Sequence, residues 1–227
     1  MSSEDSSYPK NHDGKPFALE ARHLESDGRR YSPSIARNRD AIAEVFGAHI
    51  SSSASVLEIA SGTGEHGFHL TERMPNLSWT YSDIDPESLQ SQAAWRTAAE
   101  HKRLSGPLTL DVAKPDWPAP VRVPIDTIFC ANMIHIAPFE AAKGLIKGAG
   151  DLLSQSGRLV LYGPFARNGQ IAPSNAHFSE SLKRRDPNWG VRDLDLEIAA
   201  LAKAAGLSLH TVIDMPANNL TVIFERI

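Results

Sequence analysis

Residues 56–64 read Val-Leu-Glu-Ile-Ala-Ser-Gly-Thr-Gly, an apolar run that leads directly into a loop. Two glycines of this loop, Gly62 and Gly64, stand two positions apart. Glycine is favoured where the backbone turns with positive φ, and where a ligand lies against the backbone with no Cβ between them. The stretch therefore predicts a buried strand, a ligand-binding turn and a following helix that carries Phe68 and Leu70.

The same alternation of strand and helix continues along the chain. Strand-like runs at 77–81, 108–112, 125–136 and 158–162 are separated by helical patterns, which predicts a parallel sheet covered on both faces. The last two runs, 207–213 and 220–227, are joined by a turn too short for a crossover helix, so they pair as an antiparallel hairpin. We predict an α/β fold with a Rossmann-like, doubly wound and mostly parallel sheet, closed by a C-terminal antiparallel hairpin. This combination is typical of class I methyltransferases.

Length and composition fit one domain with a short extension. We expect the polar, Ser-rich residues 1–18 of the 227 to form a flexible leader, and residues 19–227 to form a single domain with an insertion around 166–192. The net charge of −4 gives no general reason to expect a nucleic-acid partner. No stretch approaches the roughly 20 apolar residues of a membrane span, and no secretory signal is evident. We expect a cytoplasmic monomer or homodimer with no membrane partner.

An acidic residue follows the glycine loop at the distance of a ribose-binding carboxylate. Asp83 ends the next predicted strand, roughly 20 positions after the loop, and Ile84 follows it. Asp85 is the alternative, but its position beside Pro86 is that of a helix N-cap, so we favour Asp83.

Two further strand ends complete the predicted pocket. Asp111 and Val112 end the third strand, beside the position of an adenine in this fold, although a simple turn aspartate explains Asp111 equally well. The fourth strand ends with Asn132 to His135, facing the point where a methyl group on sulfur would lie.

Several distinctive strings resemble the family of methyltransferase-like protein 26. They lie at residues 31–38, 57–66, 132–136, 161–165 and 214–219, and the resemblance covers nearly everything from residue 20 to the C-terminus. It implies the class I fold and S-adenosylmethionine as the cofactor, with S-adenosylhomocysteine as the product, and it implies no substrate. The predicted cofactor-binding residues are Tyr31, Arg37, Glu58, Ala60, Ser61, Gly62, Gly64, Asp83, Ile84, Asp111, Val112 and Asn132. Arg37 suits the methionine carboxylate through a bidentate pair, and a surface ion pair is the alternative.

Two motifs that mark particular classes of methyltransferase are absent from the sequence, and their absence limits the class of methyl acceptor. The fifth strand ends Tyr162-Gly163-Pro164 without a carboxylate, and Asn132 has no neighbouring aspartate, so we expect no Mg²⁺ site and no other metal. The Asn/Asp-Pro-Pro-aromatic run of nucleic-acid amino-methylating enzymes is absent. We therefore expect O-methylation of a small molecule. A protein or RNA substrate, or a protein that binds the cofactor without catalysis, stays open as an alternative.

His135 is the candidate general base, because an imidazole titrates near neutral pH and a base is needed when the attacking atom carries a proton. The alternative is a structural histidine that hydrogen-bonds a neighbouring carbonyl. The later loops supply the predicted substrate-binding residues, which are Tyr162, Asn175, His177, Trp189 and Arg192. A role for Trp189 in the hydrophobic core of the predicted insertion explains this residue equally well.

Overall fold

The computed structural model describes residues 22–122 and 124–227, so the leader predicted at 1–18 lies outside the described residues. Within them, an eight-stranded sheet has the order β5-β4-β3-β6-β7-β10-β9, with β8 paired to β7. β10 runs antiparallel to both of its neighbours, β7 and β9, whereas β3 to β7 pair in parallel. This arrangement confirms the predicted fold class. The strands are β3 (Ser55–Ile59), β4 (Ser78–Asp83), β5 (Leu104–Thr109), β6 (Ile125–Ala131), β7 (Leu153–Ala166), β8 (Arg192–Asp193), β9 (Leu207–Met215) and β10 (Asn219–Arg226).

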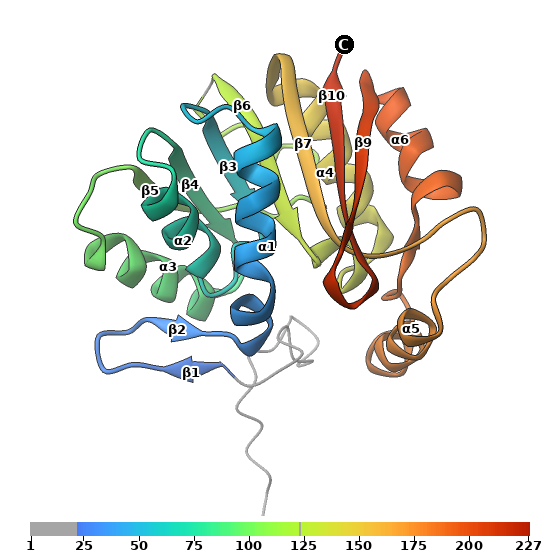
Figure 1. Ribbon diagram of the computed structural model, residues 1–227, viewed down its shortest axis with the longest axis horizontal. Helices are drawn as coiled ribbons and strands as arrows, with labels where there is room; N and C mark the ends of the chain where they lie inside the picture. Colours follow the sequence, from blue (N-terminus) through green and yellow to red (C-terminus); the bar gives the residue numbers. More distant parts are fainter. Residues whose placement is uncertain (1–21, 123) are drawn as a thin grey trace, which may run out of the picture.

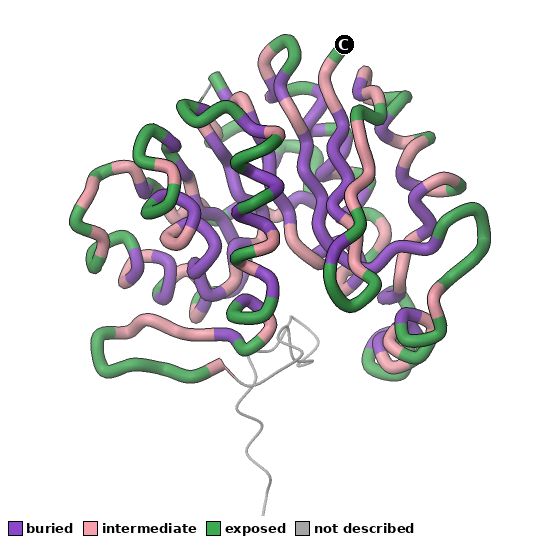
Figure 2. The backbone as a smooth tube through the Cα atoms, viewed as in Figure 1, coloured by how far each residue is buried: buried purple, intermediate pink, exposed green. Residues whose placement is uncertain are grey.

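Helices cover both faces of the sheet (Figure 1). One face carries α1 (Pro33–His49), α2 (Glu65–Arg73) and α3 (Pro86–Ala98), and the other carries α4 (Phe139–Leu152) and α6 (Ala199–Ala204). Because side chains alternate along a strand, β6 supplies both cores: Ile128 packs with α4 and α6, and Phe129 packs with α1 and α2. The sheet is consequently buried along most of its length (Figure 2).

The remaining elements gather at the carboxyl edge of the parallel strands, the lower edge in Figure 1. They are a two-stranded hairpin of β1 (His23–Leu24) and β2 (Arg30–Tyr31), the helix α5 (Pro173–Arg185), and the turn η3 (Pro216–Asn218) between β9 and β10. Two short helices, the 3-10 helix η1 (Met133–His135) and the π-helix η2 (Leu194–Ile198), follow β6 and β8. Helix α5 lies within residues 166–192, the range in which the sequence predicts an insertion. No helix in the described ranges is long and apolar enough to cross a membrane.

Three predicted strands have markedly different bounds in the structure. β7 spans Leu153–Ala166 and extends past both ends of the predicted 158–162. β5 spans Leu104–Thr109 instead of 108–112, because an edge strand tolerates the Pro107 that reads as a turn in the sequence. β6 ends at Ala131 instead of residue 136, because Asn132 takes a left-handed conformation with φ 62° and turns the chain into η1. His135 therefore lies in a short helix beyond the strand.

Candidate functional site

The glycine loop joins β3 to α2 in a conformation that needs its glycines. Gly62 has φ 56° and Gly64, the N-cap of α2, has φ 91°. A Cβ on Gly64 would come within 3.2 Å of Trp95 Cδ1, so this residue packs against α3. The loop is anchored from β4 and α3, because Tyr81 Oη donates to Gly64 O (2.8 Å) and Gln92 Nε2 donates to Gly62 O (3.0 Å). These contacts hold the loop in shape.

Asp83 at the end of β4 fixes the tip of this loop. Its Oδ2 accepts the Gly62 N–H at 2.9 Å, and its Oδ1 accepts the N–H groups of Ile84 and Asp85. Burial raises the pKa of Asp83 to about 6, against the backbone hydrogen bonds that favour the carboxylate. The Asp83 carboxylate thus holds the glycine loop in place and is a hydrogen-bond acceptor at the end of β4.

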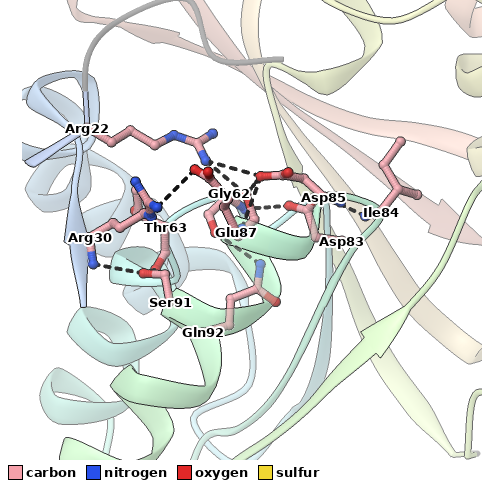
Figure 3. A network of polar contacts seen from close by, with 11 residues as sticks. Arg22, Arg30, Gly62, Thr63, Asp83, Ile84, Asp85, Glu87, Ser91 and Gln92 are labelled. Atoms are coloured by element: carbon pink, nitrogen blue, oxygen red, sulfur yellow. Dashed lines mark hydrogen bonds and ion pairs between the residues drawn. The ribbon is translucent and has the colours of Figure 1, made fainter. Parts of the chain in front are cut away.

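Asp85 has a different role, as the sequence indicates. It is the N-cap of α3, where its Oδ2 accepts the Ser88 N–H at 3.0 Å and the Ser88 hydroxyl at 2.7 Å. Arg22 donates to the same hydroxyl and lies 3.8 Å from Asp85 Oδ2, above the glycine loop (Figure 3). The Asp85 carboxylate is therefore engaged in capping α3.

Beside Asp83 lies the surface predicted for an adenine. The side chain of Ile84, which directly follows Asp83, is 42% exposed. The Leu110 N–H donates to Asp83 O at 3.2 Å, which brings Asp111 and Val112 next to this strand end. Asp111 accepts the Ala113 N–H at 3.1 Å in a turn, and Val112 is buried.

A cavity of about 660 Å³ opens beside the glycine loop, at the carboxyl ends of β3, β6 and β7. Its walls also come from α1, α2, α5 and the turn η3. The predicted site residues that line it are Arg37, Ala60, Ser61, Gly62, Asn132, Tyr162 and Asn175. The structure thus brings together residues from five elements that are far apart in the sequence.

The cavity lining does not include several other predicted residues. Glu58 is buried, with Oε2 accepting Trp79 Nε1–H at 2.9 Å. Tyr31 packs edge-on against Trp95, with ring centroids 5.1 Å apart. His177 is exposed, and Trp189 is buried in the chain segment after α5.

Arg192 instead holds the loop after β6. Its Nε donates to Ile134 O at 3.0 Å, and its Nη2 donates to Ala137 O at 2.9 Å. Its guanidinium also lies 5.1 Å from the centre of the Phe139 ring. Arg192 is therefore a structural support for η1.

His135 is fully buried, with 0% of its surface exposed, and stands outside the cavity lining. Its Nδ1 accepts the Arg192 N–H at 3.3 Å, and its ring packs edge-on against Phe165. Burial and the charge of Arg192 lower the pKa of His135 to about 3, so the imidazole is neutral at physiological pH. Because Nδ1 accepts a hydrogen bond, Nε2 carries the hydrogen, and it has no partner among the described residues.

Gly163 separates His135 from Asn132. A Cβ at Gly163 would lie 2.8 Å from His135 Nε2 and 3.1 Å from Asn132 Oδ1. Glycine is therefore required here by packing.

Among residues 22–122 and 124–227, no group of three or more His, Cys, Asp or Glu side chains is arranged to hold a metal ion.

Residues 29–226 match the family described as "Protein of unknown function (DUF938)". The chain belongs to the DUF938 family. The matched residues include every strand of the large sheet and all the helices around the cavity, from β2 to β10. The candidate site therefore lies within the part of the chain that matches the family.

Solved methyltransferase structures share this DUF938 fold at low sequence identity. An O-methyltransferase family protein from Burkholderia thailandensis is 16% identical, with a TM-score of 0.71 over 85% of this chain and 57% of that one. A Planctomyces limnophilus O-methyltransferase family 2 protein, solved with apigenin, is 19% identical, with a TM-score of 0.69 over 86% and 60%. Human N-acetylserotonin methyltransferase, solved with S-adenosylmethionine, is 15% identical, with a TM-score of 0.67 over 85% and 52%. The chain spans 52–60% of the length of these three structures.

Sequence reasoning missed two buried residues of the cavity, Asn38 and His66. Asn38 Oδ1 and His66 Nε2 are 3.0 Å apart, joining α1 to α2. Asn38 stands beside Arg37 in one of the strings shared with the methyltransferase-like family, which was a usable signal. His66 and His69 stand three positions apart in the sequence with no third metal ligand nearby, so His66 is interpreted from the sequence as a structural residue. Only the fold places it in the cavity wall.

Proposed function

We propose that this DUF938 protein is an S-adenosylmethionine-dependent methyltransferase that methylates a small molecule. One observation carries the proposal: the glycine loop forms part of the wall of a cavity of about 660 Å³, and its Gly62 N–H donates a hydrogen bond to the strand-end carboxylate of Asp83. This volume is within the range of small-ligand pockets, roughly 300–1,000 Å³. The resemblance to methyltransferase-like protein 26 and the similarity to solved methyltransferase structures support the same activity.

The residues present fit this cofactor chemically. A Cβ on Gly62 would meet only the end of the Arg22 side chain, at 3.6 Å, so a ligand has room to approach the loop backbone. The Asp83 carboxylate accepts hydrogen bonds from ribose hydroxyls, and the exposed Ile84 offers an apolar surface to an adenine. Asp111 is the candidate acceptor for the adenine amine. Arg37 in the cavity wall pairs with a carboxylate.

When bound, S-adenosylmethionine would supply a methyl group on a positively charged sulfur, and S-adenosylhomocysteine would be its product. The protein's contribution is to hold the acceptor in line within the cavity and to exclude water. We assign His135 a structural role in place of the general-base role, because it is fully buried outside the cavity lining and its Nδ1 accepts the Arg192 N–H.

The finer proposal is metal-independent O-methylation of a small molecule. The polar and apolar lining of the cavity supports a small acceptor, since Asn132 and Asn175 stand with Ile136 and Phe178 in its walls. Metal independence is supported by the end of β7, where the glycine and the proline after Tyr162 bring no carboxylate to the cavity.

Incubation with methyl-labelled S-adenosylmethionine and a cell extract tests the proposal. The extract is separated into small molecules, protein and RNA before the incubation, and one set of reactions contains EDTA. We expect label in the small-molecule fraction, with and without EDTA. Label in protein or RNA would contradict the acceptor class, and loss of transfer with EDTA that Mg²⁺ restores would contradict metal independence. Cofactor binding without transfer to any fraction would indicate a sensor.

A further inference from the structure

A chain of buried polar side chains leads from the core of the fold to the cavity. Glu58 is 1% exposed, His66 4% and Asn38 9%, and they come from β3, α2 and α1. Glu58 Oε1 lies 3.6 Å from His66 Nδ1, and His66 Nε2 lies 3.0 Å from Asn38 Oδ1. The side chain of Asn38 in turn hydrogen-bonds the hydroxyl of Tyr162, on β7. We call these four residues the Glu58–Tyr162 chain.

The directions of the two hydrogen bonds made by Asn38 follow from its chemistry. The amide oxygen of Asn38 has no hydrogen, so the His66 Nε2–H donates to it. The remaining polar group of Asn38 is its NH₂, which donates to the Tyr162 oxygen. The hydrogen of the Tyr162 hydroxyl is then left for another acceptor. Because Tyr162 lines the cavity, that acceptor belongs to a ligand or to solvent in the cavity.

The charge around this hydroxyl indicates which ligand group it meets. Arg37, one residue before Asn38, also lines the cavity, and its positive charge acts on Tyr162. A directed O–H donor beside a guanidinium is a site for a carboxylate, which accepts several hydrogen bonds at once.

We propose that Tyr162 and Arg37 bind the carboxylate of the cofactor's amino-acid part, and that Glu58, His66 and Asn38 are positioning residues which aim the Tyr162 hydroxyl at it. This inference rests on the proposed function, because it assumes an adenosyl amino acid as the ligand. It reassigns Tyr162, predicted to bind the acceptor, to the cofactor.

The test compares two ligands that differ in the amino-acid part. S-Adenosylhomocysteine has the carboxylate, whereas 5′-methylthioadenosine has the same adenosine and thioether without the amino acid. We expect Tyr162→Phe to weaken S-adenosylhomocysteine binding about 10- to 100-fold, the scale of a lost hydrogen bond to a charged group. The affinity for methylthioadenosine should stay within about 2-fold, because that ligand has no group for Tyr162 to bind.

Asn38→Asp reverses the hydrogen bond without changing the shape of the side chain. The introduced carboxylate accepts from both His66 and Tyr162, so the hydroxyl turns away from the cavity. We expect the same selective loss of S-adenosylhomocysteine affinity. We also expect a higher pKa for Tyr162, followed by NMR of ¹³Cζ-labelled tyrosine, because an amide donor is replaced by a negative charge. If the Asn38→Asp protein does not fold, Asn38→Leu replaces it in the test, because leucine removes the hydrogen bond to Tyr162 without adding a charge.

The outcomes separate this inference from the proposed function. If the wild-type protein binds neither ligand, the proposed function itself fails. If it binds both, but Tyr162→Phe weakens neither or weakens both equally, the carboxylate assignment is wrong. If Tyr162→Phe is selective while neither Asn38 variant changes S-adenosylhomocysteine affinity or the Tyr162 pKa, the positioning chain is wrong.

Discussion

Asp83→Asn replaces the charged side chain at the end of β4 by an amide of almost the same size. In the native protein, Oδ2 accepts the Gly62 N–H at 2.9 Å, and Oδ1 accepts the N–H groups of Ile84 and Asp85. The amide keeps one oxygen for the two neighbouring N–H groups and turns its NH₂ toward Gly62 or toward the ribose. The Gly62 N–H requires an acceptor, and an amide accepts fewer hydrogen bonds from ribose hydroxyls than a carboxylate does, so the substitution should impair the cofactor site.

The effect on stability should be small, because two contributions oppose each other. The pKa of Asp83 rises from 3.8 to about 6, so the carboxylate costs about 3 kcal/mol of folding free energy at pH values above 6, and the amide relieves this cost. The lost acceptor for the Gly62 N–H costs about 1–3 kcal/mol. Binding has no such compensation, and losing ribose hydrogen bonds to a charged group should weaken S-adenosylhomocysteine binding about 10- to 150-fold.

Calorimetry with S-adenosylhomocysteine and thermal melting measure both quantities. Asp85→Asn is a matched control two positions away, since asparagine caps a helix about as well as aspartate and the bond to Ser88 is retained. We expect Asp83→Asn to lose affinity with little change in Tm, and Asp85→Asn to change neither. Unchanged affinity in Asp83→Asn, or a larger loss in Asp85→Asn, would refute the ribose assignment.

Three further predictions follow from the site. The affinity of the wild-type protein for S-adenosylhomocysteine should fall as the pH drops through about 6, because protonated Asp83 loses acceptor capacity; a titration without this step, or the same step in Asp83→Asn, would contradict it. ¹⁵N spectra of His135 should show a neutral ring with hydrogen on Nε2 between about pH 5 and 8, and a ring that titrates within this range would restore the general-base interpretation. Gly64→Ala places a side chain at φ 91° and 3.2 Å from Trp95, so it should destabilise the fold by about 1–3 kcal/mol, and an unchanged Tm would exclude this strain.

Local sequence was enough to predict the parts of the fold that are specified locally. The strand, loop and helix around Gly62 follow from a short apolar run and its glycines, and the C-terminal hairpin follows from the shortness of the turn at 215–219. The end of β6 was not predictable in this way, because residues 133–136 continue the apolar run. Only the left-handed conformation of Asn132, stabilised in its tertiary context, turns the chain into η1.

The residues of the candidate site likewise fall into those that local sequence predicts and those that it does not. Asp83 could be predicted because its distance from the glycine loop is a property of one strand–helix–strand unit. The Glu58–Tyr162 chain could not, because its members come from four elements that meet only in the folded sheet. His135 was expected over the pocket from its place after an apolar run, but η1 directs it against Phe165 and the Arg192 backbone.

Cofactor binding is the central claim, and calorimetry of the wild-type protein tests it most directly. S-Adenosylmethionine and S-adenosylhomocysteine are each titrated at about 1 mM, the upper end of common enzyme KM values. We predict saturable binding of both ligands at one site per chain, accompanied by a rise in Tm. Absence of heat and of a thermal shift with both ligands would contradict it.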